Sequence, residues 1–105
     1  MTPIVRISRG NFPPERYEPL HSAFAASRST LESAMRRLRG HRMSYAAIDR
    51  DSSSIVFVSF WDDLDAAKQL GQLPEMQEAA GELVKLGVQF ERPVINYSTL
   101  WRVAG

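Results

Sequence analysis

The sequence predicts a single α+β domain in which helices cover one face of an antiparallel β-sheet. The spacing of the apolar residues changes along the chain from strand-like to helix-like and back, giving the order strand, helix, two strands, helix pair and strand. The 105 residues lie near the commonest size of one domain. Because the chain has no internal repeat, low-complexity segment or linker, we expect residues 1–105 to form one domain.

The N-terminal part predicts a strand followed by a long helix. β-Branched residues alternate over residues 3–9, as in a strand. Apolar residues then recur at helical spacing from Tyr17 until Gly40 terminates the pattern. Proline is tolerated only in the first turn of a helix, so Pro19 requires the helix to begin near Tyr17 or to bend. Ser29-Thr30 marks a second candidate interruption.

A β-hairpin is predicted next. Residues 42–49 and 55–61 suit two strands, and the polar run 50–54 suits the turn between them. The second strand, Ile-Val-Phe-Val-Ser-Phe-Trp, is apolar on both faces, which indicates that both faces of the sheet are covered. Helices can cover one face, and a second sheet can cover the other.

The C-terminal part predicts two helices and further strands. Asp62 suits the N-cap of a helix that ends at Gly71. Pro74 suits the first position of another helix, which Gly87 closes. Strands are expected over residues 88–90 and 94–103.

This order, βαββαβ with an extra strand, corresponds to the ferredoxin-like arrangement, in which all helices lie on one face of the sheet. The opposite face would be bare in a monomer, although residues 55–61 are apolar there. A contact between two copies about a two-fold axis is the simplest cover, since one self-complementary patch serves both subunits. We therefore expect a homodimer through the open sheet face.

Composition narrows the range of partners. Thirteen Lys and Arg against twelve Asp and Glu give a net charge of +1, so neither nucleic acid nor a membrane is expected as a partner. No cysteine is present, which excludes disulfides and thiol nucleophiles and suits a reducing, cytoplasmic location. The N-terminus lacks a signal-like pattern, and no apolar run approaches the ~20 residues that span a bilayer.

Four side chains are candidates for a ligand site. Trp61 can stack on a planar aromatic substrate, or it can pack between sheet and helix. His21 lies one helical turn after Tyr17 and can act as a general base in the cleft, or it can be an ordinary half-exposed histidine. Tyr45 can donate a hydrogen bond to a ligand carbonyl or serve the core. Trp61, Tyr45 and Tyr17 are the predicted ligand-binding residues, and His21 is the predicted base.

Other sites lack support. The aspartates are spaced as turn and cap residues, without a calcium loop or a carboxylate–histidine di-iron pattern, so no metal is predicted. No Gly-x-Ser-x-Gly elbow occurs, and two histidines outside any motif do not define a catalytic triad. Neither a glycine-rich phosphate-binding loop nor a flavin motif occurs, so no cofactor is predicted. A basic cluster can hold an anion, but cations are expected in the last turn of a helix. Its members are Arg36, Arg37, Arg39 and Arg42.

The segment from Ser59 to Ala67, SFWDDLDAA after a hairpin, resembles the strand-to-helix signature of the dimeric α+β barrel superfamily, and most closely that of the antibiotic biosynthesis monooxygenase-like proteins. The resemblance spans nearly the whole chain. Further matching stretches are LRG at 38–40, LPEM at 73–76 and LGVQFERP at 86–93.

The resemblance implies a dimer whose two sheets form an α+β barrel, with a pocket between the helices and the sheet of each subunit that Trp61 lines. Haem-degrading members pair this tryptophan with an asparagine on the first strand and a histidine on the following helix. Residues 2–9 contain no asparagine and residues 62–86 contain no histidine, so haem degradation is disfavoured.

Two functions remain open. The first is a cofactor-independent monooxygenase acting on a small aromatic or polyketide-like compound, with Trp61 and Tyr45 positioning the ring and His21 removing a proton. The alternative is a non-catalytic dimeric binding or structural module. The enzyme requires these three side chains to converge on one accessible cavity, whereas the module does not.

Overall fold

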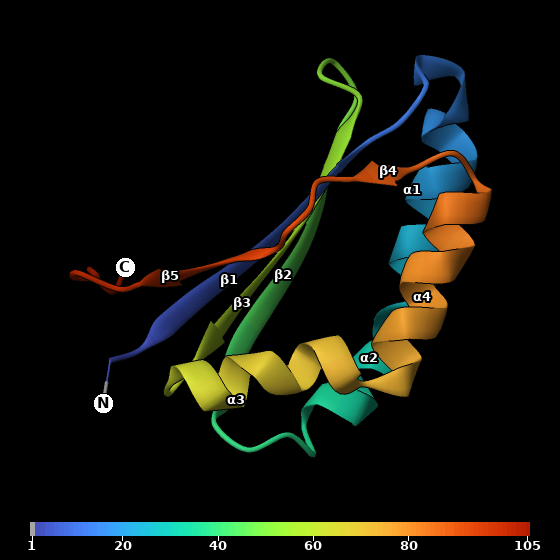
Figure 1. The fold of residues 1–105 in the computed structure, drawn as a ribbon. Helices are drawn as coiled ribbons and strands as arrows, with labels where there is room; N and C mark the ends of the chain where they lie inside the picture. Colours follow the sequence, from blue (N-terminus) through green and yellow to red (C-terminus); the bar gives the residue numbers. More distant parts are fainter. Residues whose placement is uncertain (1) are drawn as a thin grey trace.

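The computed structural model describes residues 2–105 and confirms the predicted α+β, ferredoxin-like fold. A five-stranded antiparallel sheet has the order β2-β3-β1-β4, with β5 also paired to β1, and the helices lie on one side of it (Figure 1). The strands are β1 (Ile4–Asn11), β2 (His41–Asp49), β3 (Ser54–Trp61), β4 (Gln89–Phe90) and β5 (Ile95–Ser98). The helices are α1 (Tyr17–Ala26), α2 (Arg28–Met35), α3 (Leu64–Lys68) and α4 (Pro74–Lys85), with 3-10 turns η1 (Pro14–Arg16) and η2 (Gln69–Gln72).

The central strand β1 determines which side chains face the helices. It pairs with β3 along its whole length, from Ile4 opposite Trp61 to Asn11 opposite Ser54. Successive side chains of a strand point to opposite faces. Ile4 packs in the core beneath the helices, so Arg6 and Ser8 share that inner face with it.

The expected long helix is two helices. Its first part begins at Tyr17, which places Pro19 in the first turn. The break lies at Ser27, two residues before the expected interruption, and α2 ends at Met35 rather than near Leu38. The Ser27 hydroxyl donates to the carbonyl oxygen of Phe24 at 2.7 Å, a local bond that competes with the helical ladder.

The predicted cap of α3 is one residue off. Asp63, not Asp62, is the N-cap: its Oδ1 accepts a hydrogen bond from the amide of Ala66 at 2.8 Å. Asp62 still belongs to the connection from the strand, because its amide donates to the carbonyl of Gly40 at 2.9 Å. Its carboxylate instead accepts from Arg42 Nε at 2.6 Å.

The last strand is shorter than predicted, ending at Ser98 instead of Val103. One further backbone bond joins the amide of Thr99 to the carbonyl of Pro3, and β1 itself begins at Ile4. Beyond that point no strand is available for pairing within residues 2–105. Large apolar side chains of this C-terminal segment are exposed, at 92% for Leu100 and 77% for Trp101.

The first strand extends to Asn11, two residues beyond the predicted strand over residues 3–9, and so includes an asparagine. Asn11 is exposed and pairs with Ser54, whereas Trp61 pairs with Ile4 at the other end of the strand. Asn11 therefore lies far from the tryptophan along the sheet. The prediction that the first strand lacks an asparagine is wrong, but the strand offers none beside Trp61.

The core lies between the sheet and the helices and forms two clusters. One surrounds the fully buried Trp61 and includes Met35 and Leu70. The other surrounds Leu20 and includes Leu83 of α4. None of the helices within residues 2–105 is long and apolar enough to cross a membrane.

Within residues 2–105, no helix covers the opposite side of the sheet (Figure 1), and the strand register places apolar side chains there. Tyr45 packs edge-on against Phe60 with ring centroids 6.3 Å apart, and 58% of Tyr45 remains exposed. The register places further apolar side chains of β1, β2, β3 and β5 on the same face. This outer face consists of Val5, Ile7, Met43, Tyr45, Val56, Val58, Phe60, Ile95 and Tyr97.

Candidate functional site

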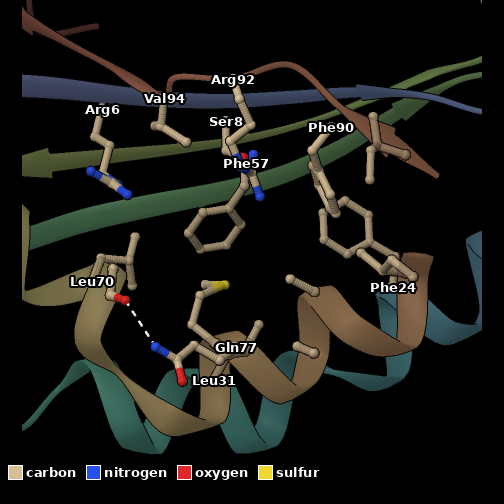
Figure 2. A pocket seen from close by; sticks show the side chains of 16 residues that line it. Arg6, Ser8, Phe24, Leu31, Phe57, Leu70, Gln77, Phe90, Arg92 and Val94 are labelled. Carbon is tan, nitrogen blue, oxygen red and sulfur yellow. Dashed lines mark hydrogen bonds between the residues drawn. The ribbon is translucent and has the colours of Figure 1, made fainter. Parts of the chain in front are cut away.

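A cavity of about 160 Å³ lies between the inner face of the sheet and helices α2 and α4 (Figure 2). Its walls are predominantly apolar and include three phenylalanine rings. Figure 2 shows the ring of Phe57 between the sheet side, with Arg6 and Arg92, and the helix side, with Leu31 and Gln77. The principal apolar lining residues are Phe24, Leu31, Phe57, Met76, Leu83 and Phe90.

Local structure explains why space remains there. Helix α4 turns Met76, Ala80 and Leu83 toward the sheet at helical spacing. Ala79 also lines the cavity, so α4 presents two short side chains to the space that Phe57 borders from the sheet. The cavity therefore lies where small residues of α4 oppose the centre of the sheet.

The charged side chains of the lining are both arginines. Arg6 is partly buried, and this burial, together with the neighbouring positive charge of Arg92, lowers the pKa of its guanidinium. Arg6 Nη1 donates to Asn96 Oδ1 at a long 3.4 Å. Arg92 lies over the ring of Phe90, 5.0 Å from its centroid. Neither arginine has an ion-pair partner within residues 2–105.

Two neutral polar residues complete the lining. The Gln77 amide nitrogen donates to the carbonyl of Gly71 at 3.1 Å, drawn as the dashed line in Figure 2. Ser8 follows Arg6 on the inner face of β1. The described lining residues include no His, Asp, Glu, Lys or Tyr, so this wall can bind and orient a ligand but supplies no ordinary general base.

Trp61 lies outside this cavity. Its side chain is 0% exposed and packs with Ala66 and Ala67 of α3. The indole Nε1 donates to Ser59 Oγ at 2.8 Å, and the ring of His41 lies 5.0 Å away between centroids. The indole is therefore packed and hydrogen-bonded in the core.

Tyr17 and His21 lie together on α1, also outside the cavity. Their ring centroids are 5.7 Å apart, and the guanidinium of Arg50 lies 4.1 Å above the Tyr17 ring. His21 is exposed to solvent. Tyr45 is on the outer face of the sheet, so Trp61, Tyr45 and His21 do not converge on one cavity. The predicted roles of these residues in ligand binding and catalysis stay predictions.

A second, wider groove of about 840 Å³ lies between α2 and the edge strand β2, and Tyr45 borders it. His41 Nε2 lies 2.7 Å from Ser44 Oγ there, and partial burial lowers the pKa of this histidine. The other lining residues alternate apolar and charged side chains, as on a solvated surface. Within residues 2–105, no group of three His, Cys, Asp or Glu side chains is arranged to hold a metal ion.

The two cavity arginines are not among the site residues predicted from the sequence. A signal for Arg6 was available, because it shares the inner face of the strand with Ile4, and a charged residue at a core-facing position usually has a specific partner. No local pattern marks Arg92, which follows β4 in a connecting segment.

Solved structures of the same fold include SnoaB, a cofactor-independent oxygenase from Streptomyces nogalater, at 18% identity and a TM-score of 0.67 over 100% of both chains. A candidate antibiotic biosynthesis monooxygenase from Nitrosomonas europaea is 10% identical, with a TM-score of 0.72 over 98% of this chain and 95% of that one. A dimeric protein of unknown function and ferredoxin-like fold from Bacteroides fragilis is 16% identical, with a TM-score of 0.71 over 92% and 96%.

No protein-family model and no curated protein matches the sequence. At these identities the structural likeness establishes the fold, and it agrees with the resemblance carried by the Ser59–Ala67 segment. The chain thus has the ferredoxin-like fold found in antibiotic biosynthesis monooxygenase-like proteins.

Proposed function

We propose that this protein is a homodimer that binds a small aromatic molecule in the cavity between its sheet and its helices. The observation that carries the proposal is the lining itself, in which the aromatic rings of Phe24, Phe57 and Phe90 surround a space large enough for a ligand. A planar ring can make favourable offset or edge contacts with such walls.

The volume limits the ligand. An apolar protein cavity of about 150 Å³ accommodates benzene. The cavity of about 160 Å³ therefore suits one aromatic ring with small substituents. A polycyclic, polyketide-like compound would require the side chains of α4 to move apart.

Cofactor-independent oxygenation is the enzymatic form of this proposal. In that chemistry a substrate anion reduces dioxygen directly, so the protein has to bind the anion and exclude water. SnoaB, of the same fold, is described as an oxygenase of this kind. The non-catalytic alternative is favoured by the absence of an ordinary base among the described lining residues.

Binding is tested by titrating single-ring and two-ring aromatic compounds against the purified protein in isothermal calorimetry. We expect single rings to bind more tightly. Ala80→Leu, which fills the cavity, should abolish binding, whereas Ala26→Leu, on an exposed position of α1, should leave it unchanged. Equal binding by wild type and Ala80→Leu would contradict the proposed site.

Catalysis is tested separately, by following oxygen consumption with each bound compound. Consumption that Ala80→Leu removes would support an oxygenase, and binding without consumption would support the module. His21→Ala extends the test: lost consumption at unchanged affinity would support the predicted base, although His21 is exposed outside the cavity.

A further inference from the structure

We infer that the cavity selects a single-ring aromatic anion, such as an aromatic carboxylate, with Arg6 as its main counter-ion and Arg92 as a second cation. The inference deepens the proposed function and rests on it, since it names the chemical class of the ligand bound at the same site.

The positive charges of the cavity lining lack a counter-charge within residues 2–105. Two guanidinium groups line one small, mostly apolar cavity, and neither has a carboxylate partner within residues 2–105. Their mutual repulsion and the partial burial of Arg6 both disfavour this arrangement. By contrast, other arginines of the chain form ion pairs with carboxylates, as Arg37 does with Glu75 at 2.8 Å. A bound anion would offset the repulsion between the two cavity arginines.

The sheet fixes the position of Arg6 at the cavity. Arg6 stands in the middle of β1, between β3 and β5, so its backbone is held on both sides. Among the described residues 2–105, only Asn96 accepts a side-chain hydrogen bond from this guanidinium, at a long 3.4 Å, which leaves further N–H donors for a ligand. A guanidinium can bind a carboxylate through two parallel hydrogen bonds.

The cavity has a cationic side and an apolar side. Figure 2 shows Arg6 and Arg92 entering from the sheet side, with the Phe57 ring below them and apolar side chains of the helices opposite. A ligand with an anionic group at one end and a ring at the other matches this division. A small inorganic anion would leave the apolar part unfilled, and a neutral ring would leave the arginines unpaired.

The test compares benzoate with benzamide, which have nearly the same shape and differ in charge. We expect benzoate to bind the wild-type dimer about tenfold or more tightly, the range expected when a charged hydrogen-bonded group is added. Arg6→Met should remove most of this preference while leaving benzamide affinity almost unchanged. Arg16→Met, an exposed arginine that does not line the cavity, controls for the general loss of positive charge.

Arg92→Met provides a second variant, because Arg92 lies in an exposed connection whose substitution leaves the sheet core intact. It should lower benzoate affinity without lowering benzamide affinity. Equal affinities of wild type for benzoate and benzamide would overturn the inference and leave the proposed function standing. Binding of neither compound, nor of any other single-ring compound, would overturn both.

Discussion

Ser59 and Trp61 form a buried hydrogen-bonded pair, so the tryptophan predicted to line a ligand site is part of the core. Both are 0% exposed, both lie on the inner face of β3, and the indole nitrogen donates to the serine hydroxyl at 2.8 Å. Residues two apart on a strand share a face, so this pair is set by local backbone geometry. The bond satisfies the one polar group of the indole where no solvent reaches it.

We expect Ser59→Ala to lower the free energy of unfolding by about 1–3 kcal/mol, because it leaves the buried indole N–H without an acceptor. Urea denaturation of Ser59→Ala, Trp61→Phe and the double variant measures the coupling. The serine substitution should cost about 1 kcal/mol less when Phe replaces Trp61. Ser22→Ala, exposed on α1, is the control, and strictly additive costs would contradict the assignment.

For individual residues, the sequence predicted only part of what the structure shows. It identified Trp61 as a strand-end residue between sheet and helix, and packing there was one of the two stated alternatives. It did not identify Arg6 and Arg92, because an arginine in a strand and another in a loop come together only after β1 pairs with β4 and β5, which flank Arg92 in the chain. Local sequence patterns cannot predict long-range strand pairing of that kind.

The start of α3 shows the same limit for elements. Two consecutive aspartates each suit an N-cap, and sequence rules cannot choose between them. Tertiary contacts decide: the Asp62 amide bonds to Gly40, and Asp63 is left to cap the helix and to pair with Arg39. Elements with strong internal signals were predicted well, as in the hairpin and in α4 after Pro74. The last strand was overextended, since its end depends on where β1 begins.

We expect Asp63→Ala to destabilise the protein more than Asp62→Ala, because only the former removes a helix cap. The hydrogen bond from Arg39, followed by that from the Ala66 amide, lowers the pKa of Asp63. A lowered folded pKa gives stability above the unfolded value of about 4 that is lost as the pH falls through the folded pKa.

Urea denaturation from pH 7 down to pH 2 would show this effect. The gap in stability between wild type and Asp63→Ala should be full at pH 7 and should narrow below pH ~4 as the carboxylate is protonated. At pH 7, Asp62→Ala should lower the free energy of unfolding by less than Asp63→Ala does, since the ion pair of Asp62 with Arg42 lies on the surface. A gap that stays constant down to pH 2 would argue against the ionised cap.

For the whole molecule, the uncovered outer face has the strongest consequences. A monomer would expose a continuous set of apolar side chains, among them Tyr45, Ile95 and Tyr97 at 48–58% exposure. Contiguous apolar patches of this kind mark interaction sites. The doubly apolar strand at residues 55–61 predicted such a face from sequence alone, and the register places Val58 near its middle.

We therefore expect Val58→Asp to convert the proposed dimer to a folded monomer, because burying an unpaired charge on each side of a two-fold contact is strongly unfavourable. Sedimentation velocity gives the assembly state, and circular dichroism checks the fold. Tyr45→Lys, on a more exposed part of the outer face, should act in the same direction. Val84→Asp, exposed on α4, should leave the dimer intact, and an intact Val58→Asp dimer would contradict the proposed interface.

Strand β1 presents Arg6 and Ser8 to the cavity and Val5 and Ile7 to the outer face. One strand thus lies between the proposed ligand site and the proposed dimer interface. Where two equilibria share a structural element, any effect of one on the other is reciprocal by thermodynamic necessity. If each bound ligand tightens the dimer by some factor, the dimer must hold that ligand more tightly than the monomer does by the same factor.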